Sequence, residues 1–291
     1  MGPGSRVKGQ EIRVEGHRRQ HHDNQLKPSA LSNQQQKMRQ PVPPVLSLHL
    51  LRLADDRLIL GHRLSEWCGH GPILEEDIAM ANIALDLIGQ ANLLLDLAGR
   101  EEGKGRSADA LAYFREAVEF RNALIMELPR GDFAITVMRQ FLVSVHSAML
   151  LEHLQRSTHA ELAGIAAKAF KEARYHARHS ADWVLKLGDG TDESHRRSQD
   201  ALDELWRYTG ELFDVPDDER PLIDAGIAVD VSTLREAWRE QVGMIIGAAT
   251  LEVPAEVFMQ RGGRTGRHTE HLGHLLAEMQ IVARSFPGAE W

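Results

Sequence analysis

Cysteine, aromatic residues and long apolar runs are all scarce in this sequence, and each shortage excludes a class of protein. Cys68 is the single cysteine among 291 residues, which excludes an intrachain disulfide and a zinc or iron–sulfur site built from cysteines. We expect it to be a small buried thiol in a reducing, cytoplasmic setting. No run of about 18 apolar residues occurs, so a membrane span is not expected. Aromatic residues make up only 5%, and the alanine- and leucine-rich runs favour an all-α chain over a sandwich or barrel.

Positive charge is scarce outside the N-terminal tail. Residues 1–45 carry eight Lys or Arg against three Asp or Glu, which leaves 26 against 39 for the remaining chain. The acidic remainder disfavours nucleic-acid binding, because a phosphate backbone needs a basic face. The tail has a glutamine run and several prolines but no apolar periodicity, which predicts a disordered segment, either a basic arm or a non-native appendage. We therefore expect one helical domain over 46–291.

Helical periodicity, by contrast, is present in segment after segment. Ser107 and Asp132 are expected N-caps, and the glycines at 188 and 190 end the helix over 165–187. Two antiparallel hairpins separated by an extra helix predict a ferritin-like four-helix bundle with additional packed helices. The expected helices span 46–67, 75–98, 107–129, 132–154, 165–187, 194–213, 234–249 and 269–285. The stripe expected to be buried in the second helix is Ile78, Ala81, Leu85, Ile88, Asn92 and Leu95.

The helix over 165–187 carries two ionisable residues within its apolar stripe. Glu172 and His176 recur with the stripe at steps of three and four, so both should point inward. In ferritin-type bundles two helices each give a Glu and two give Glu-x-x-His to a di-metal site. Here the spacing is four, because the residue three after Glu172 is Tyr175.

The neighbouring helices supply too few ligands to complete such a site. At the level of Glu172 the preceding helix reads QFLVSV over 140–145 and has no carboxylate. The first hairpin offers an aspartate at 55 or 56 together with Asp86, and Gly89 stands where Glu-x-x-His would place a histidine. Two adjacent cations need their charge neutralised and their coordination filled. The ligand count therefore argues against a di-iron centre.

The favoured interpretation is a buried polar network. Glu172, His176 and Asp86 would pair within the bundle, with Lys168 one turn before Glu172 or with an Arg or Asp across the bundle. A di-metal site with a non-standard ligand set and a single-metal site remain as alternatives. Metal analysis separates them from the network.

The loop before the last helix is rich in arginine. Arg261, Arg264 and Arg267 could receive an anion, such as the phosphates of coenzyme A, or an acidic partner. A plain solvated loop fits the same residues. Two helical histidine pairs have metal-ligand spacing without accompanying carboxylates: His146 with His153, and His271 with His274.

Six segments together resemble the PaaC subunits of ring 1,2-phenylacetyl-CoA epoxidases, which are bacterial multicomponent monooxygenases. The resemblance runs in order from about residue 46 to Trp291, outside the tail. It is carried by RLSEWCGHGP at 63–72, NIALDLIGQA at 82–91, KEARYH at 171–176, LWRYT at 205–209, GIAVD at 226–230 and HTEHLG at 268–273.

The resemblance implies a ferritin-like subunit that is not catalytic on its own and holds no cofactor. Its partner would be the related catalytic PaaA-type subunit, which holds the di-iron centre and binds the thioester, together with the other epoxidase components. Asp86, Glu172 and His176 would then be vestigial-site residues with a structural role. We expect part of the first hairpin, including Trp67, to contact the partner. A coenzyme A thioester-binding module is the remaining alternative.

Overall fold

The computed structural model describes residues 1–2, 44–255 and 257–289. The tail predicted over 1–45 lies outside the described residues except at its two ends. The described residues from 44 onwards form one compact unit, whose first helix begins at Pro44, two residues before the expected boundary.

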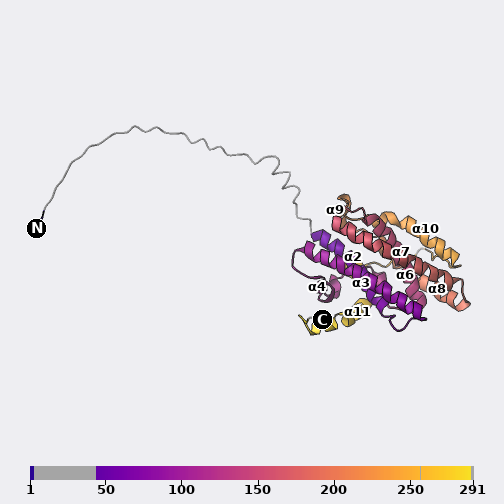
Figure 1. The fold of residues 1–291 in the computed structure, drawn as a ribbon. Helices are drawn as coiled ribbons and strands as arrows, with labels where there is room; N and C mark the ends of the chain where they lie inside the picture. The colour runs from indigo at the N-terminus through magenta and orange to yellow at the C-terminus, as the bar shows by residue number, and fades with distance from the viewer. Residues whose placement is uncertain (3–43, 256, 290–291) are drawn as a thin grey trace. The chain divides into compact units, whose positions relative to one another are not determined.

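The described residues form α-helices and short 3-10 segments, with no strand among them (Figure 1). In chain order the elements are α2 (Pro44–Ser65), α3 (Leu74–Glu102), α4 (Ala108–Tyr113), η1 (Ala117–Glu119), α5 (Leu124–Glu127), α6 (Phe133–Leu154), α7 (Ala160–Gly188), α8 (Asp192–Trp206), η2 (Thr209–Phe213), η3 (Asp217–Glu219), α9 (Arg220–Asp224), η4 (Val231–Leu234), α10 (Arg235–Ala248), η5 (Gly263–Thr265) and α11 (Glu270–Ser285). The helices expected over 234–249 and 269–285 correspond to α10 and α11, whereas the one expected over 194–213 is divided into α8 and η2.

Two antiparallel hairpins, α2 with α3 and α6 with α7, make the predicted ferritin-like bundle. Gly61 permits the close approach of α2 to α3, because a Cβ there would lie 2.9 Å from Cγ1 of Ile88. The turn between them is held by Asp77, whose carboxylate accepts the backbone N–H groups of Gly69 and Gly71 at 3.0 and 3.2 Å. Gly69 has a φ of 78°, a conformation that glycine adopts without strain.

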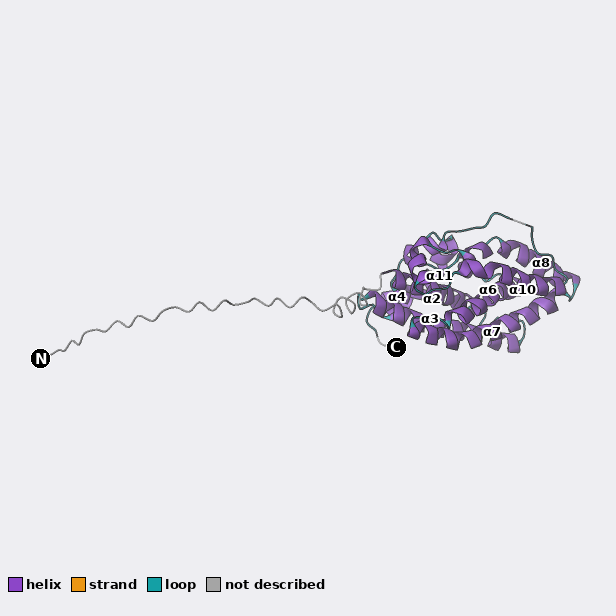
Figure 2. Cartoon of the chain, turned by 90° about the horizontal axis from the view of Figure 1, so that it is seen from above, coloured by secondary structure: helices purple, strands orange, loops and turns teal. Residues whose placement is uncertain are grey.

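α6 is the core helix of the bundle and lies in its middle (Figure 2). Asp132 caps it as expected, accepting the N–H of Ile135 at 2.9 Å. Although no membrane span was expected, α3 and α6 could each cross a membrane by length and hydropathy, but 78% of the apolar window of α6 is buried inside the protein. The indole of Trp238 fixes α10 against α6 by donating to the carbonyl of Leu142 at 3.0 Å.

The prediction of a single helix over 107–129 is wrong. Ser107 caps α4, but α4 ends at Tyr113, and η1 and α5 follow as separate short elements. The buried carboxylate of Asp55 on α2 explains the break. It accepts the guanidinium of Arg115 at 3.0 Å and the backbone N–H of Arg121 at 2.8 Å, so these backbone segments leave the helical path to satisfy a buried charge.

α3 buries a face that shares only Leu95 with the predicted stripe. Ile83 and Leu87 are in the core, whereas Ile78 and Leu85 are 54% and 67% exposed. Apolar residues occupy both faces of this helix, so periodicity alone could not choose between them.

Trp67 was expected at the partner interface and Cys68 in the core, and the structure contradicts both predictions. Trp67 is 7% exposed, donates its indole N–H to Thr136 at 2.9 Å and packs edge-to-face against Phe133. It therefore belongs to the core of this chain and cannot serve as a partner contact. Cys68 is exposed, because the tight turn that follows carries its side chain out of the core.

Candidate functional site: the polar centre of the bundle

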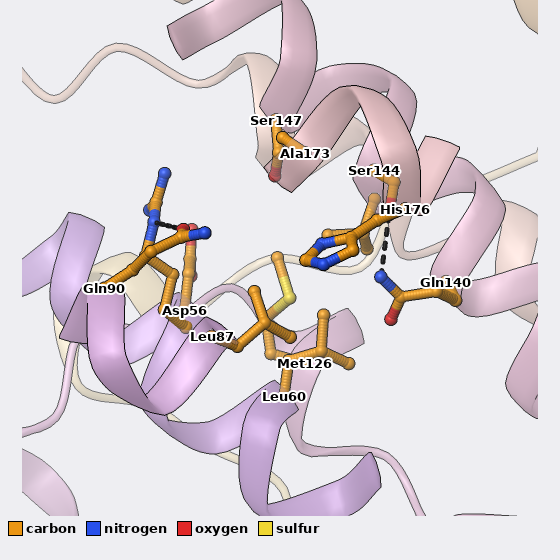
Figure 3. A pocket seen from close by; sticks show the side chains of 12 residues that line it. Asp56, Leu60, Leu87, Gln90, Met126, Gln140, Ser144, Ser147, Ala173 and His176 are labelled. Carbon is orange, nitrogen blue, oxygen red and sulfur yellow. Dashed lines mark hydrogen bonds between the residues drawn. The ribbon is translucent and has the colours of Figure 1, made fainter. Parts of the chain in front are cut away.

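A small cavity lies between the four long helices at the expected level (Figure 3). Its volume is about 20 Å³, enough for about one water molecule. Gln140 and Ser144 on α6 line it together with His176 on α7, which confirms the register that the hairpin turns predicted. Gln90 from α3 lies on the opposite side of the cavity from His176 (Figure 3).

Arg57 on α2 begins a hydrogen-bonded chain across the bundle. Its Nε–H donates to Oε1 of Gln90 at 3.0 Å, and the Gln90 amide donates to Oε2 of Glu172 at 2.8 Å. A second guanidinium nitrogen donates to the carbonyl of Leu53 at 2.7 Å. Glutamine thus connects a buried cation on one hairpin to a carboxylate on the other.

The charge of Arg57 is retained although the side chain is fully enclosed. Burial lowers the pKa of Arg57 to about 10, and the nearby cation Arg264 adds to that effect, while the charge of Asp56 opposes it. The guanidinium is protonated at neutral pH, because 10 is well above 7. A divalent ion about 5 Å from this guanidinium would be repelled by it by about 7 kcal/mol at an effective dielectric constant near 20, and nearby carboxylates such as Asp56 would offset part of that repulsion. Arg57 therefore makes the bundle centre less favourable for a metal cation than its carboxylates alone would.

His176 pairs with Asp86 beside this chain. The distance from Nε2 of His176 to Oδ2 of Asp86 is 3.0 Å. Burial lowers the pKa of His176, and the hydrogen bond and charge of Asp86 oppose that shift only in part. Its backbone carbonyl accepts the Ser180 hydroxyl at 2.7 Å, which satisfies a further polar group on α7.

The aspartates of α2 are each bonded to other partners, although Asp56 lines the cavity. Asp55 is committed to Arg115 and to the backbone of Arg121. Asp56 holds the guanidinium of Arg264 in a two-bond pair at 2.8 and 2.7 Å and also accepts the N–H of Ala123 at 2.8 Å. Both carboxylates are thus bonded to partners other than the residues around Asp86.

The side chains present do not fit a pair of metal ions. Among residues 44–255 and 257–289, no three His, Cys, Asp or Glu side chains group as potential metal ligands. The expected ligands are divided instead: Asp86 bonds His176, and Glu172 bonds Gln90. Each carboxylate is thus already bonded to a protein partner.

Lys168 lies outside the polar chain. It is exposed on α7, and the cation that reaches Glu172 through Gln90 is Arg57. The inward position of Arg57 could have been predicted from the sequence. Arg57 follows the buried Leu53 and Ala54 by four and three residues, which places the three side chains on one face of α2.

The arginine loop divides into one structural and two surface residues. Arg264 is half-buried against Asp56, and that pairing raises its pKa although burial alone would lower it. Arg261 forms a surface ion pair with Asp214, and Arg267 is exposed. Since Arg264 is already paired inside the protein, the three arginines do not form one anion site.

Neither histidine pair comes together as metal ligands. His146 is buried against Phe213, while His153 is exposed on the same helix. Burial, with the charges of Arg264 and Arg57, lowers the pKa of His146 to about 3. His271 is half-buried and His274 exposed.

Comparison with known proteins gives the family. The sequence matches the family described as Phenylacetic acid catabolic protein over residues 20–291. The chain belongs to this family. The match begins at residue 20, within the segment over 1–45 that was predicted to be a disordered tail. The family resemblance therefore extends further towards the N-terminus than the six segments indicate.

Within the phenylacetic acid catabolic protein family, one relative is similar over nearly its whole length. The C-type subunit of the 1,2-phenylacetyl-CoA epoxidase of Escherichia coli (strain K12) is 48% identical over 246 residues, covering 84% of this chain and 99% of the relative. The predicted resemblance to this subunit family is confirmed. The relative is by name one subunit of an epoxidase.

Proposed function

We propose that this chain is a non-catalytic structural subunit of a 1,2-phenylacetyl-CoA epoxidase. It pairs with the di-iron catalytic subunit, stabilises it, and acts with it and the other epoxidase components in aerobic phenylacetate catabolism in the cytoplasm. Asp86, Glu172 and His176 are remnants of a metal site that now hold the two hairpins together. The similarity to a C-type epoxidase subunit supports the assignment to the complex.

The observation that carries the non-catalytic role is the position of Arg57. Its guanidinium lies at the level where a ferritin-type bundle holds metal and is bonded through Gln90 to Glu172. A protonated arginine supplies internally the positive charge that metal ions would otherwise bring. The carboxylates that remain are thereby neutralised without metal.

The test is to co-express the catalytic subunit with and without this chain. We expect the pair to co-purify, the iron to remain with the catalytic subunit, and phenylacetyl-CoA epoxidation in the reconstituted system to be lost when this chain is omitted. The isolated chain, prepared with iron, should hold well below one iron per molecule. Two tightly bound irons in the isolated chain, with turnover in the absence of the catalytic subunit, would overturn the proposal.

Glu172→Gln probes the remnant site within the complex. This substitution keeps the shape of the side chain but removes its charge, so we expect turnover to remain within about twofold of wild type, an effect below about 0.4 kcal/mol. Loss of turnover in a complex that still assembles would show that Glu172 takes part in the chemistry.

A further inference from the structure

α3 presents a second apolar face outward. Leu74, Ile78 and Leu85 lie at helical spacing and are 71%, 54% and 67% exposed; we call these residues the apolar stripe. The most apolar window of α3 has a mean hydropathy of 1.5, yet only 44% of it is buried. Extended exposed apolar surface on a soluble protein is typical of an interaction site.

α7 lies beside α3 (Figure 2). Glu76 bonds His179 at 3.1 Å, and Asp86 bonds His176 at 3.0 Å. These contacts join α3 to α7 in an antiparallel arrangement, so the outward faces of the two helices form one side of the bundle. Tyr175, which is 43% exposed, is at the level of Leu85 on that side.

Four basic residues follow one another along the outer side of α7. Lys168, Lys171, Arg174 and Arg178 are all exposed; we call them the basic ridge. No ion pair joins any of them to an acidic residue among the described parts of the chain, in a protein whose net charge is −8.

Ion pairs within the chain neutralise some other exposed arginines. Arg100 pairs with Glu161, and Arg196 pairs with Glu193. Arg239 and Arg267 are exposed without an ion pair among the described residues, but the basic ridge differs from them in gathering four such charges along one helix. Its charge is therefore available to a molecule outside the chain.

We propose that the apolar stripe and the basic ridge together form the surface that binds the catalytic subunit, through a helical face whose apolar centre is bordered by carboxylates. This inference rests on the proposed function and adds the location and chemistry of the interface. A face made of two helices of 29 residues is about 43 Å long and about 20 Å wide. It can bury about 800 Å² per partner, the area of a stable protein interface.

A protein partner fits this face better than an anionic membrane does. The remainder of the chain beyond residue 45 is acidic, with 26 basic against 39 acidic residues, and a charged lipid surface would repel it. An interfacial helix also inserts its apolar face about 5–10 Å into the bilayer, whereas α3 is held in place by a core on its opposite face. A facing protein surface needs no insertion.

The experiment measures binding of purified full-length chain to the catalytic subunit for two double variants. Ile78→Asp/Leu85→Asp places charge in the apolar stripe, and Lys171→Glu/Arg178→Glu reverses charge in the basic ridge. We expect each to weaken pairing at least tenfold. For wild type, the dissociation constant should rise between 50 and 500 mM NaCl, and the charge-reversed variant should lose most of that salt dependence.

Matched variants on other faces serve as controls. Ile281→Asp on α11, where the side chain is 60% exposed, and Arg239→Glu on α10, also exposed, should pair as wild type does. Thermal unfolding of each isolated variant shows whether it is folded, and only folded variants are compared.

Three results would overturn the inference. If wild type pairs and both folded double variants pair equally well, the interface lies elsewhere although the proposed function stands. If the double variants instead lose binding to vesicles of anionic phospholipid while pairing is intact, the face is a membrane surface. If wild type does not pair at all, the proposed function fails and this assignment fails with it.

Discussion

Arg57 is the residue on which the interior of the bundle depends. It donates to Gln90 and to the carbonyl of Leu53, and through Gln90 it helps to order the half-buried carboxylate of Glu172. A buried polar chain of this kind stabilises only while every member is bonded, because an unpaired polar group in the interior costs about 1–3 kcal/mol.

Replacing Arg57 with methionine keeps much of the length of the side chain and removes its donors. We expect Arg57→Met to lower the free energy of unfolding by about 2–3 kcal/mol, because Gln90 loses its partner and the nearby carboxylates lose a buried counter-charge. Urea unfolding followed by circular dichroism measures the change. The matched control is Lys168→Met, which should stay within about 0.5 kcal/mol because its side chain is exposed. A Lys168 effect as large as that of Arg57 would return Lys168 to the network.

His146 gives the protein a defined sensitivity to acid. Burial lowers its pKa to about 3, whereas an unfolded histidine has a pKa near 6.5. Its contribution to stability is therefore complete above about pH 6.5 and is lost as pH falls towards 3. Between pH 7 and 4.5, wild type should lose about 2–3 kcal/mol more than His146→Leu, as measured by urea unfolding at each pH. His153→Leu, at an exposed site on the same helix, should follow wild type.

At the scale of elements, α11 is attached to the bundle by a buried pair at its start. His268 lies 2.6 Å from Oε2 of Glu127 through Nδ1 and 3.0 Å from the carbonyl of Phe120 through Nε2. Glu127 also accepts the N–H of Thr269, which orders the entry to α11. Further along, the Gln280 amide donates to two carbonyls near α4, so the helix is held at two points.

The attachment of α11 should weaken as pH rises. Burial alone would lower the pKa of His268, but the hydrogen bond and charge of Glu127 outweigh it and raise the pKa. The stabilisation is complete below about pH 6.5 and is lost as pH rises through the raised value. His268→Gln should therefore cost about 1.5–3 kcal/mol at pH 6 and less at pH 9, measured by urea unfolding. His274→Gln, exposed on α11, should show no such pH dependence.

At the scale of the whole molecule, α3 has an apolar core face and an apolar outer face. Pairing that covers the outer face stabilises both proteins by mass action, because the partner binds only the folded chain. We expect the midpoint of thermal unfolding of the pair to exceed that of this chain alone and to rise with protein concentration. Differential scanning calorimetry at two concentrations tenfold apart measures both effects. A midpoint independent of concentration and of partner would contradict the proposed pairing.

The all-α bundle and the level of its polar centre were predictable from the sequence, since apolar spacing defines helices and turn positions align them. The positions of Gln140 and His176 follow from counting residues from the same turn, and the structure confirms them. The break after Tyr113 and the division of the later helix near Trp206 were not predictable. They depend on contacts between distant residues, such as Asp55 with Arg115, which no local pattern contains.

What the sequence determined by itself was the class of fold, the register of the hairpins and the shortage of metal ligands, because these depend on spacing and on which residue types are present. Only the tertiary structure decided which face of α3 is buried, that Arg57 rather than Lys168 reaches Glu172, and that Trp67 belongs to the core. A helix with two apolar faces has two acceptable orientations until its neighbours are in place. A long cation such as arginine acquires its partner only from whichever carboxylate or amide the packed helices bring within hydrogen-bonding distance.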